Sequence, residues 1–148
     1  MPKHSETRKL PFTASQMFDL VADVRLYPEF LPWTAAARIR SSKEIPGGQE
    51  ISADLVISFK VFRERFTSKV TLYESINRID TEYLDGPFKH LQSRWEFEDV
   101  EGGCEVKFWV DFEFRNKVLQ GAAGMFFNEA MLRIVKAFEK RATDLYGG

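Results

Sequence analysis

The chain has 148 residues, with 21 Lys and Arg against 22 Asp and Glu and a formal net charge of −1 at pH 7. This length suits one domain with a sizeable core and is short for two, and the balanced charge argues against DNA as a partner. The single cysteine, Cys104, excludes an internal disulfide, and the polar N-terminal decapeptide has no signal-peptide pattern. We therefore expect a cytoplasmic protein.

The first elements in chain order are an edge strand and an amphipathic helix. Residues 3–9 carry polar side chains on both faces, as expected of a strand at the edge of a sheet. Thr13 and Gln16 have the spacing of a capping box, and Phe12 and Met17 have that of a hydrophobic staple, so a helix should begin after Thr13.

Two prolines interrupt the chain after this helix. Pro28 and Pro32 disfavour a regular helix, so the stretch LYPEFLPW is expected to form one helical turn or a loop. Its aromatic residues either pack onto the first helix or form the mouth of a pocket that touches a membrane surface, where Trp and Tyr favour the interface. In that second interpretation Phe30 and Trp33 form one lip, and Pro87 and Phe88 of a later turn form the other.

From about residue 34 to residue 115, apolar side chains recur at every second position. The apolar positions fall in five runs: Ile51, Ala53, Leu55, Ile57 and Phe59; Phe62, Phe66, Val70 and Leu72; Ile79 and Tyr83; Leu91, Trp95 and Phe97; and Cys104, Val106, Phe108, Val110, Phe112 and Phe114. Short turns such as Asp85-Gly86-Pro87 and Glu101-Gly102-Gly103 separate the runs. This pattern predicts an antiparallel meander with one face covered.

A long C-terminal helix is predicted next. Asn116 can cap a helix that reaches nearly to Gly147. About 30 residues at ~1.5 Å per residue give roughly 45 Å, which is enough to cross a sheet whose strands have ~12 residues. The late half carries a plain apolar stripe at Leu132, Val135, Phe138, Ala142 and Leu145, whereas the early half, VLQGAAGMFF, is apolar around much of its circumference.

These elements predict one α+β domain over residues 1–148, in which a curved antiparallel sheet wraps around the long helix. Such an arrangement leaves a hollow between sheet and helix unless large side chains fill it. The 14 phenylalanines can serve either purpose, because Phe packs densely in a core and also lines apolar pockets. Composition and periodicity leave both alternatives open.

Particular sequence motifs are more specific than the periodicity. The strings VADVRLYPEFLPW, FKVFRERFTSKVTL, YLDGPFKHLQSRWEF and CEVKFWVDFEF closely resemble the coenzyme Q-binding START-domain family, which belongs to the polyketide cyclase/dehydrase-like superfamily and is related to the bacterial ribosome-association toxins. The resemblance extends from about Ser5 to Leu145. It implies the helix-grip fold of START-like and Bet v 1-like proteins.

The resemblance also implies a function. Members of this family would hold a polyprenyl quinone, ubiquinone (coenzyme Q), in an apolar tunnel and act as a lipid chaperone that supports respiratory electron transport. No cofactor would be required, the protein would not be an enzyme, and a peripheral contact with the inner membrane would be expected. Ribosomal subunits remain an alternative partner, and an aromatic polyketide cyclase or dehydrase remains an alternative activity.

Candidate tunnel residues are the inward-facing apolar residues of the strands and of the early part of the helix. They are Leu55, Ile57, Phe62, Phe66, Leu91, Trp95, Phe108, Val110, Phe112, Leu119, Ala122, Met125 and Phe126. For any single one of them, membership of an ordinary core is the simpler interpretation. Gly121 and Gly124 either allow the helix to approach the sheet closely or act as a hinge that admits a chain.

Catalytic signals are weak. The two histidines, His4 and His90, and the single cysteine cannot form a Cys/His zinc site, and no metal site is predicted. Glu64 and Ser68 have the inward parity of their strand, where they can face a quinone head group unless a bulge turns them outward. Glu64 is the one candidate for the inward acid or base that a cyclase or dehydrase needs. For the hypothesis of ribosome binding, Lys136, Lys140 and Arg141 of the last helix can form a local basic patch that contacts RNA phosphates.

Overall fold

The sheet and helices follow the predicted order. The computed structural model describes residues 3–59 and 62–147, and of these the side chains at positions 59, 62, 119, 122–124 and 126–128 are not described. The elements are β1 (Lys3–Leu10), α1 (Ala14–Ala22), η1 (Val24–Glu29), β2 (Thr34–Ile45), β3 (Gly48–Phe59), β4 (Phe62–Tyr73), η2 (Glu74–Ile76), β5 (Arg78–Asp85), β6 (Phe88–Val100), β7 (Gly103–Phe114) and α2 (Lys117–Tyr146), where η marks a 3-10 helix.

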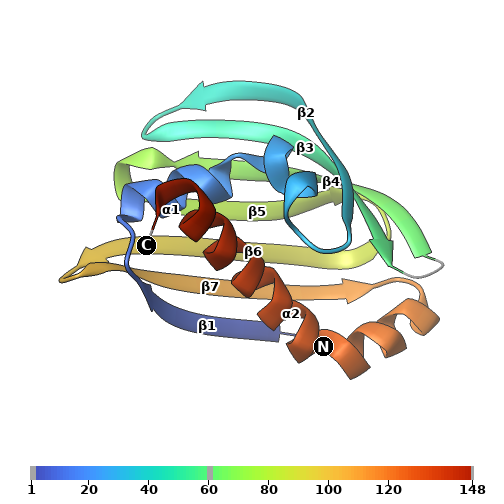
Figure 1. Cartoon of the computed structure of the whole chain (residues 1–148). Helices are drawn as coiled ribbons and strands as arrows, with labels where there is room; N and C mark the ends of the chain where they lie inside the picture. The colour runs from blue at the N-terminus through green and yellow to red at the C-terminus, as the bar shows by residue number, and fades with distance from the viewer. Residues whose placement is uncertain (1–2, 60–61, 148) are drawn as a thin grey trace.

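The strands form a seven-stranded sheet in the order β1-β7-β6-β5-β4-β3-β2. Every neighbouring pair is antiparallel, so β2 to β7 form the predicted meander. The first strand, β1, pairs with the last strand, β7, and forms the edge of the sheet opposite β2. Both helices and η1 lie on one face of the curved sheet, and α2 crosses that face diagonally (Figure 1). The helix-grip prediction is therefore confirmed.

The first helix begins where the capping box predicted. The backbone N–H of Gln16 donates to Thr13 Oγ1 at 3.0 Å, and the backbone N–H of Thr13 donates to Gln16 Oε1 at 3.0 Å. These bonds satisfy two of the N–H groups that a helix start leaves unpaired. The apolar face of α1, which includes Met17, Phe18 and Val21, is buried against the sheet.

The segment with the two prolines forms η1 and a short loop. Pro28 lies inside this 3-10 helix, and the Tyr27 hydroxyl donates a hydrogen bond to the Val21 carbonyl oxygen. The loop ends at Trp33, whose φ of 62° lies in the left-handed region that a bulky residue rarely adopts. The chain thus turns sharply between η1 and β2.

The C-terminal helix is 30 residues long and has the predicted cap, because the backbone N–H of Val118 donates to Asn116 Oδ1 at 2.8 Å. The middle of its predicted stripe, Val135, Phe138 and Ala142, is buried. The two ends of that stripe, Leu132 and Leu145, are exposed. Among the helices of the described residues, none combines the length and the hydropathy that a membrane span needs.

Candidate ligand-binding cavity

A cavity of about 580 Å³ lies between the concave face of the sheet and the helices, with walls from η1, β3 to β7 and α2. This volume is within the range of about 300–1,000 Å³ that is typical of small-molecule sites. Eight of the predicted tunnel residues line it: Leu55, Ile57, Phe66, Leu91, Trp95, Phe108, Val110 and Phe112. Their role in binding stays a prediction, but their inward orientation is now a structural fact.

Aromatic rings gather at two ends of the cavity. At one end Trp95 stacks on Phe108 with the ring centroids 4.2 Å apart and meets the edge of Phe138 at 5.2 Å. At the other end Phe88 contacts Phe66 at 5.2 Å and stacks on Phe114 at 4.6 Å. Offset and edge-to-face contacts of this kind stabilise the two clusters. The rings therefore fill the ends of the hollow and leave its middle open.

The middle of the concave face carries small side chains. Ala53 on β3 lies opposite Ser68 on β4, Thr81 on β5 lies opposite Ser93 on β6, and Ser93 lies opposite Val110 on β7. All five line the cavity. Because alternate residues of a strand face the same side, these small residues leave space between the two aromatic clusters. The cavity is therefore open where the side chains of the sheet are small.

Sequence reasoning missed part of this lining. Thr81 and Ser93 lie between inward-facing residues that the strand pattern had identified, namely Ile79 and Tyr83 on β5 and Leu91 and Trp95 on β6. Their position in the period-two pattern identifies both as inward-facing. They were not predicted to line the tunnel because they are polar and the prediction included apolar residues only. Other lining residues come from η1, the following loop and α2, and no strand pattern predicts them: Val24, Tyr27, Leu31, Met131, Ile134 and Phe138.

Charged residues are found at the rim. Among the described lining residues, Glu64, Glu129 and Arg133 are charged, and all three are exposed to solvent. Arg133 Nη2 lies 3.0 Å from Glu129 Oε1 in an i,i+4 pair on α2. Glu64 thus has the inward parity predicted for it but stands at the opening. Uncharged side chains form the interior, which suits an apolar ligand.

Several predicted site residues lie elsewhere. Met125 does not line the cavity, because its side chain is 79% exposed and lies away from the buried stripe of Val135, Phe138 and Ala142. The early helix is apolar around its circumference, so its sequence did not indicate which side faces the sheet. The side chains of Phe62, Leu119, Ala122, Gly124 and Phe126 lie outside the described part of the structure.

The predicted mouth is only partly correct. Trp33 and Pro87 line the cavity, but Phe88 is 3% exposed and belongs to the buried aromatic cluster, so it is not an outer lip. Phe30 packs edge-on against Phe138 at 5.4 Å and beneath the Arg141 guanidinium group. It therefore holds the end of η1 against α2, so these contacts are with the C-terminal helix and not with the first helix, on which the packing alternative had placed it.

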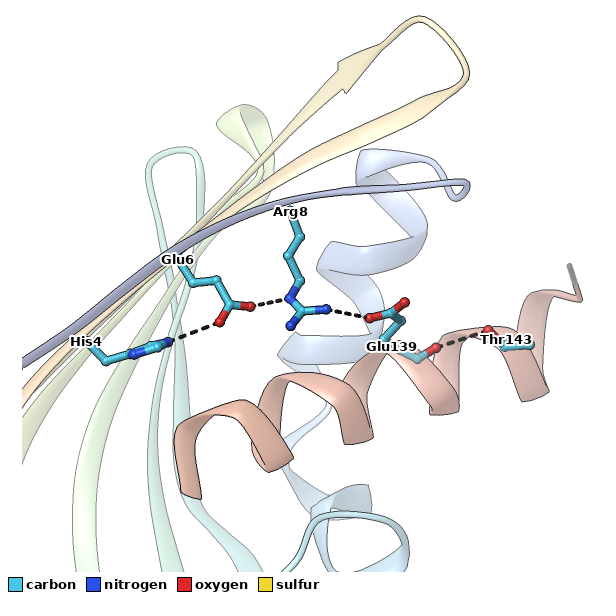
Figure 2. A network of polar contacts seen from close by, with 5 residues as sticks. All are labelled: His4, Glu6, Arg8, Glu139 and Thr143. Atoms are coloured by element: carbon cyan, nitrogen blue, oxygen red, sulfur yellow. Dashed lines mark hydrogen bonds and ion pairs between the residues drawn. The ribbon is translucent and has the colours of Figure 1, made fainter. Parts of the chain in front are cut away.

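A polar network joins β1 to the late half of α2 (Figure 2). His4 Nε2 lies 3.2 Å from Glu6 Oε1, Glu6 also pairs with Arg8, and Arg8 Nη1 lies 3.0 Å from Glu139 Oε2. The hydrogen bond to Glu6 raises the pKa of Arg8, although burial works in the opposite direction. These inward-facing polar residues explain why β1 showed no apolar face in the sequence.

The remaining candidates for chemistry lie outside the cavity. His90 Nε2 lies 3.1 Å from Asp111 Oδ1, on residues that face away from the cavity. Cys104 is fully buried, and burial raises the pKa of its thiol to about 11. In the part of the chain that the structure describes, no three His, Cys, Asp or Glu residues are grouped closely enough to hold a metal ion.

The curved sheet, the long helix across it and the apolar hollow between them define a START-like helix-grip protein. The chain belongs to the family described as "Polyketide cyclase / dehydrase and lipid transport", which matches residues 10–139. It is 38% identical over 148 residues to the ribosome association toxin RatA of Rickettsia prowazekii, and the alignment covers 98% of this chain and 99% of that protein.

Three further proteins are similar to this chain. The chain is 33% identical over 150 residues to the mitochondrial coenzyme Q-binding protein COQ10 homolog B of Xenopus laevis, which covers 98% of this chain but 59% of that protein. The solution structure of an 18 kDa protein from Caulobacter crescentus superimposes with a TM-score of 0.83 at 31% identity, covering 100% of both chains. The aromatase/cyclase Zhui, at 16% identity and a TM-score of 0.79, shares the fold.

Proposed function

We propose that the protein binds a polyprenyl quinone, in the first place ubiquinone, in this cavity and carries it as a lipid chaperone that supports respiratory electron transport. The observation that carries the proposal is the apolar hollow of about 580 Å³, in which the charged residues among the described lining are exposed at the rim. The similarity to a coenzyme Q-binding protein supports the choice of ligand. No catalytic role is assigned to the cavity, because the two acids among its described lining residues, Glu64 and Glu129, are exposed at the opening.

Burial of the isoprenoid tail supplies the driving force. At ~25 cal/mol per Å² of apolar area, several hundred Å² of tail surface contribute on the order of 10 kcal/mol relative to water. Relative to the interior of a bilayer, the transfer is close to neutral, which suits a carrier that must load and release its cargo. In this proposal the peripheral membrane contact is assigned to Trp33 and Pro87, which line the cavity and are residues of the predicted mouth.

Two variants that add the same indole ring test this proposal. Leu91→Trp places the ring in the cavity, whereas Met125→Trp places it on an exposed part of α2. We expect the first variant to weaken binding of a short-tailed ubiquinone at least ~10-fold and the second to leave it unchanged, with thermal unfolding as the control for folding. Equal affinities in both variants, or no quinone in an organic extract of the purified protein analysed by mass spectrometry, would contradict the proposal.

A second candidate function is interaction with ribosomal subunits. It is favoured by the 38% identity to a ribosome association toxin along the full length of both chains. The predicted basic patch gives it little support, because Arg141 Nη2 lies 3.0 Å from Glu29 Oε1 and Lys140 pairs with Asp144. Cosedimentation with ribosomal subunits over a salt series tests this function independently of quinone binding, since phosphate contacts weaken steeply with salt.

A further inference from the structure

The floor of the cavity contains a buried hydroxyl group with no partner. Ser68 is 4% exposed, and its Oγ forms no hydrogen bond with any described residue. Buried polar groups in native proteins are nearly always hydrogen-bonded, because an unpaired one loses its contact with water without compensation. Ser68 also lines the cavity, so a molecule in the cavity is the natural source of the missing partner.

Two more hydroxyl groups, on the next two strands, lie on the same face of the sheet as Ser68. Ser68 on β4 lies opposite Tyr83 on β5, and Thr81 is two residues from Tyr83 on the same side of that strand. Thr81 in turn lies directly opposite Ser93 on β6. Directly opposed residues have Cβ atoms about 4.5–5.5 Å apart, and diagonal neighbours are about 7–8 Å apart. One ring can therefore span the diagonal pair of Ser68 and Thr81.

These hydroxyl groups are distinct from the other polar groups near the cavity. The Tyr83 hydroxyl accepts a hydrogen bond from the Phe88 backbone N–H at 3.1 Å and is thus engaged in holding the turn before β6. The charged lining residues that the structure describes, Glu64, Glu129 and Arg133, are exposed at the rim. The three hydroxyls therefore form an uncharged polar spot in the apolar interior.

The chemistry of this spot selects its ligand group. A hydroxyl donates one hydrogen bond and carries no charge. A carboxylate or phosphate on the ligand would remain without a compensating cation at this depth, whereas a carbonyl or ether oxygen needs only a donor. The spot thus matches a neutral ring that bears oxygen atoms.

We propose that Ser68, Thr81 and Ser93 form a recognition site for the carbonyl oxygens of a neutral oxygenated ring, and that they hold the ring on the floor of the cavity with its apolar tail directed to the rim. This inference deepens the proposed quinone binding and rests on it. It assigns the ring end of the ligand to the sheet and the tail end to the opening beside Glu64 and α2. The Ser68 hydroxyl gains its partner when the ligand binds.

The test compares two ligands with the same short isoprenoid tail, one ending in the ubiquinone ring and the other in a benzene ring without oxygen. In the wild type the quinone should bind about tenfold more tightly than the oxygen-free ligand, since loss of a buried hydrogen bond has roughly this effect. Ser68→Ala and Ser93→Ala should each remove much of this difference by weakening the quinone alone. Val110→Ala, on the same floor, should affect both ligands alike.

Two further readouts separate recognition from packing. The carbonyl stretch of the bound quinone should shift to lower frequency in the wild type and return toward its free value in Ser68→Ala. The melting temperature of ligand-free Ser68→Ala should equal or exceed that of the wild type, because the hydroxyl has no partner to lose. If the wild type binds both ligands equally, the recognition site is overturned while the cavity remains a lipid site. If it binds neither, the proposed function itself fails.

Discussion

The two halves of α2 differ sharply in how they meet the rest of the protein. In the late half, Phe138 and Ala142 are buried, and Arg8 and Glu29 pair with Glu139 and Arg141 from opposite sides. The Tyr146 hydroxyl adds a bond to the Gln16 carbonyl oxygen at 3.1 Å. In the early half, the described side chains of Val118 and Met125 are 71% and 79% exposed.

This difference indicates where a ligand can enter. The late half is held by aromatic packing and by ion pairs, and it closes the cavity at the Trp95 end. Near the middle of α2, the lining residues Glu129 and Arg133 are exposed at the rim, whereas Ala130 and Met131 are half-buried. Segments with few buried contacts open most readily. On the residues that the structure describes, we therefore expect the ligand to enter away from the Trp95 end.

The largest expected effect comes from removing the anchor of the late half. Phe138 lies 5.2–5.4 Å from the rings of Trp95, Tyr27 and Phe30, so Phe138→Ala should lower the free energy of unfolding by about 3–5 kcal/mol. Met125→Ala, in the early half, should change it by less than ~0.5 kcal/mol. Urea unfolding monitored by circular dichroism measures both, and similar losses for the two variants would refute the contrast.

Cysteine reactivity gives the next largest contrast. Because burial raises the pKa of Cys104 to about 11, only about one thiol in a thousand is ionised at pH 8, against about a quarter for an ordinary exposed thiol. A cysteine introduced by Met125→Cys should therefore react with a thiol reagent at least ~100-fold faster than Cys104. Stopped-flow absorbance resolves the two phases.

The same thiol predicts a pH dependence with a definite sign. The folded pKa of Cys104 is raised, so its stabilising contribution is complete below the unfolded pKa of ~8.5 and is lost as pH rises toward about 11. Cys104→Ala should remove this alkaline loss. In the reactivity experiment, a thiol at position 104 that reacts as fast as one at position 125 would contradict the prediction, because it would show that the buried start of β7 opens freely.

The smallest effect concerns Gly121 in the early half. A Cβ built on Gly121 meets no atom within 4 Å, so close approach to the sheet does not require glycine there. Gly121→Ala should raise the free energy of unfolding by about 0.5–1 kcal/mol. Gly102→Ala is the control with the opposite sign, because its φ of +85° disfavours any side chain although the nearest atom is 4.0 Å away.

The hinge hypothesis for Gly121 stays a prediction that the same variant tests. If early-half flexibility admits the quinone, Gly121→Ala should slow ligand exchange in stopped-flow fluorescence while increasing stability. Unchanged exchange rates would remove that role from Gly121. The outcome bears on the comparison directly, because it tells whether the exposed half of α2 moves or is merely less covered.

Local patterns predicted most of the architecture. The capping box of Thr13 and Gln16, the cap at Asn116 and the period-two strands are signals within a few residues of each other, and each formed as expected. The prediction was wrong for Met125, where an all-round apolar helix contained no phase, and for Phe88, which a turn pattern placed at the surface. In both cases the burial of the side chain depended on whether another element packs over it, which local spacing does not indicate.

By itself, the sequence determined the order of strands and helices, the inward and outward faces of strands β3 to β7, and the family, because these depend on short-range spacing and on local sequence motifs. Only the tertiary structure decided that the inward face encloses a hollow. Whether facing side chains meet depends on the register of five neighbouring strands. This register places the small residues Ala53, Ser68, Thr81, Ser93 and Val110 on one face between two aromatic clusters, with Ser68 and Thr81 as diagonal neighbours. Residues this distant along the chain become neighbours only through the curvature and pairing of the folded sheet.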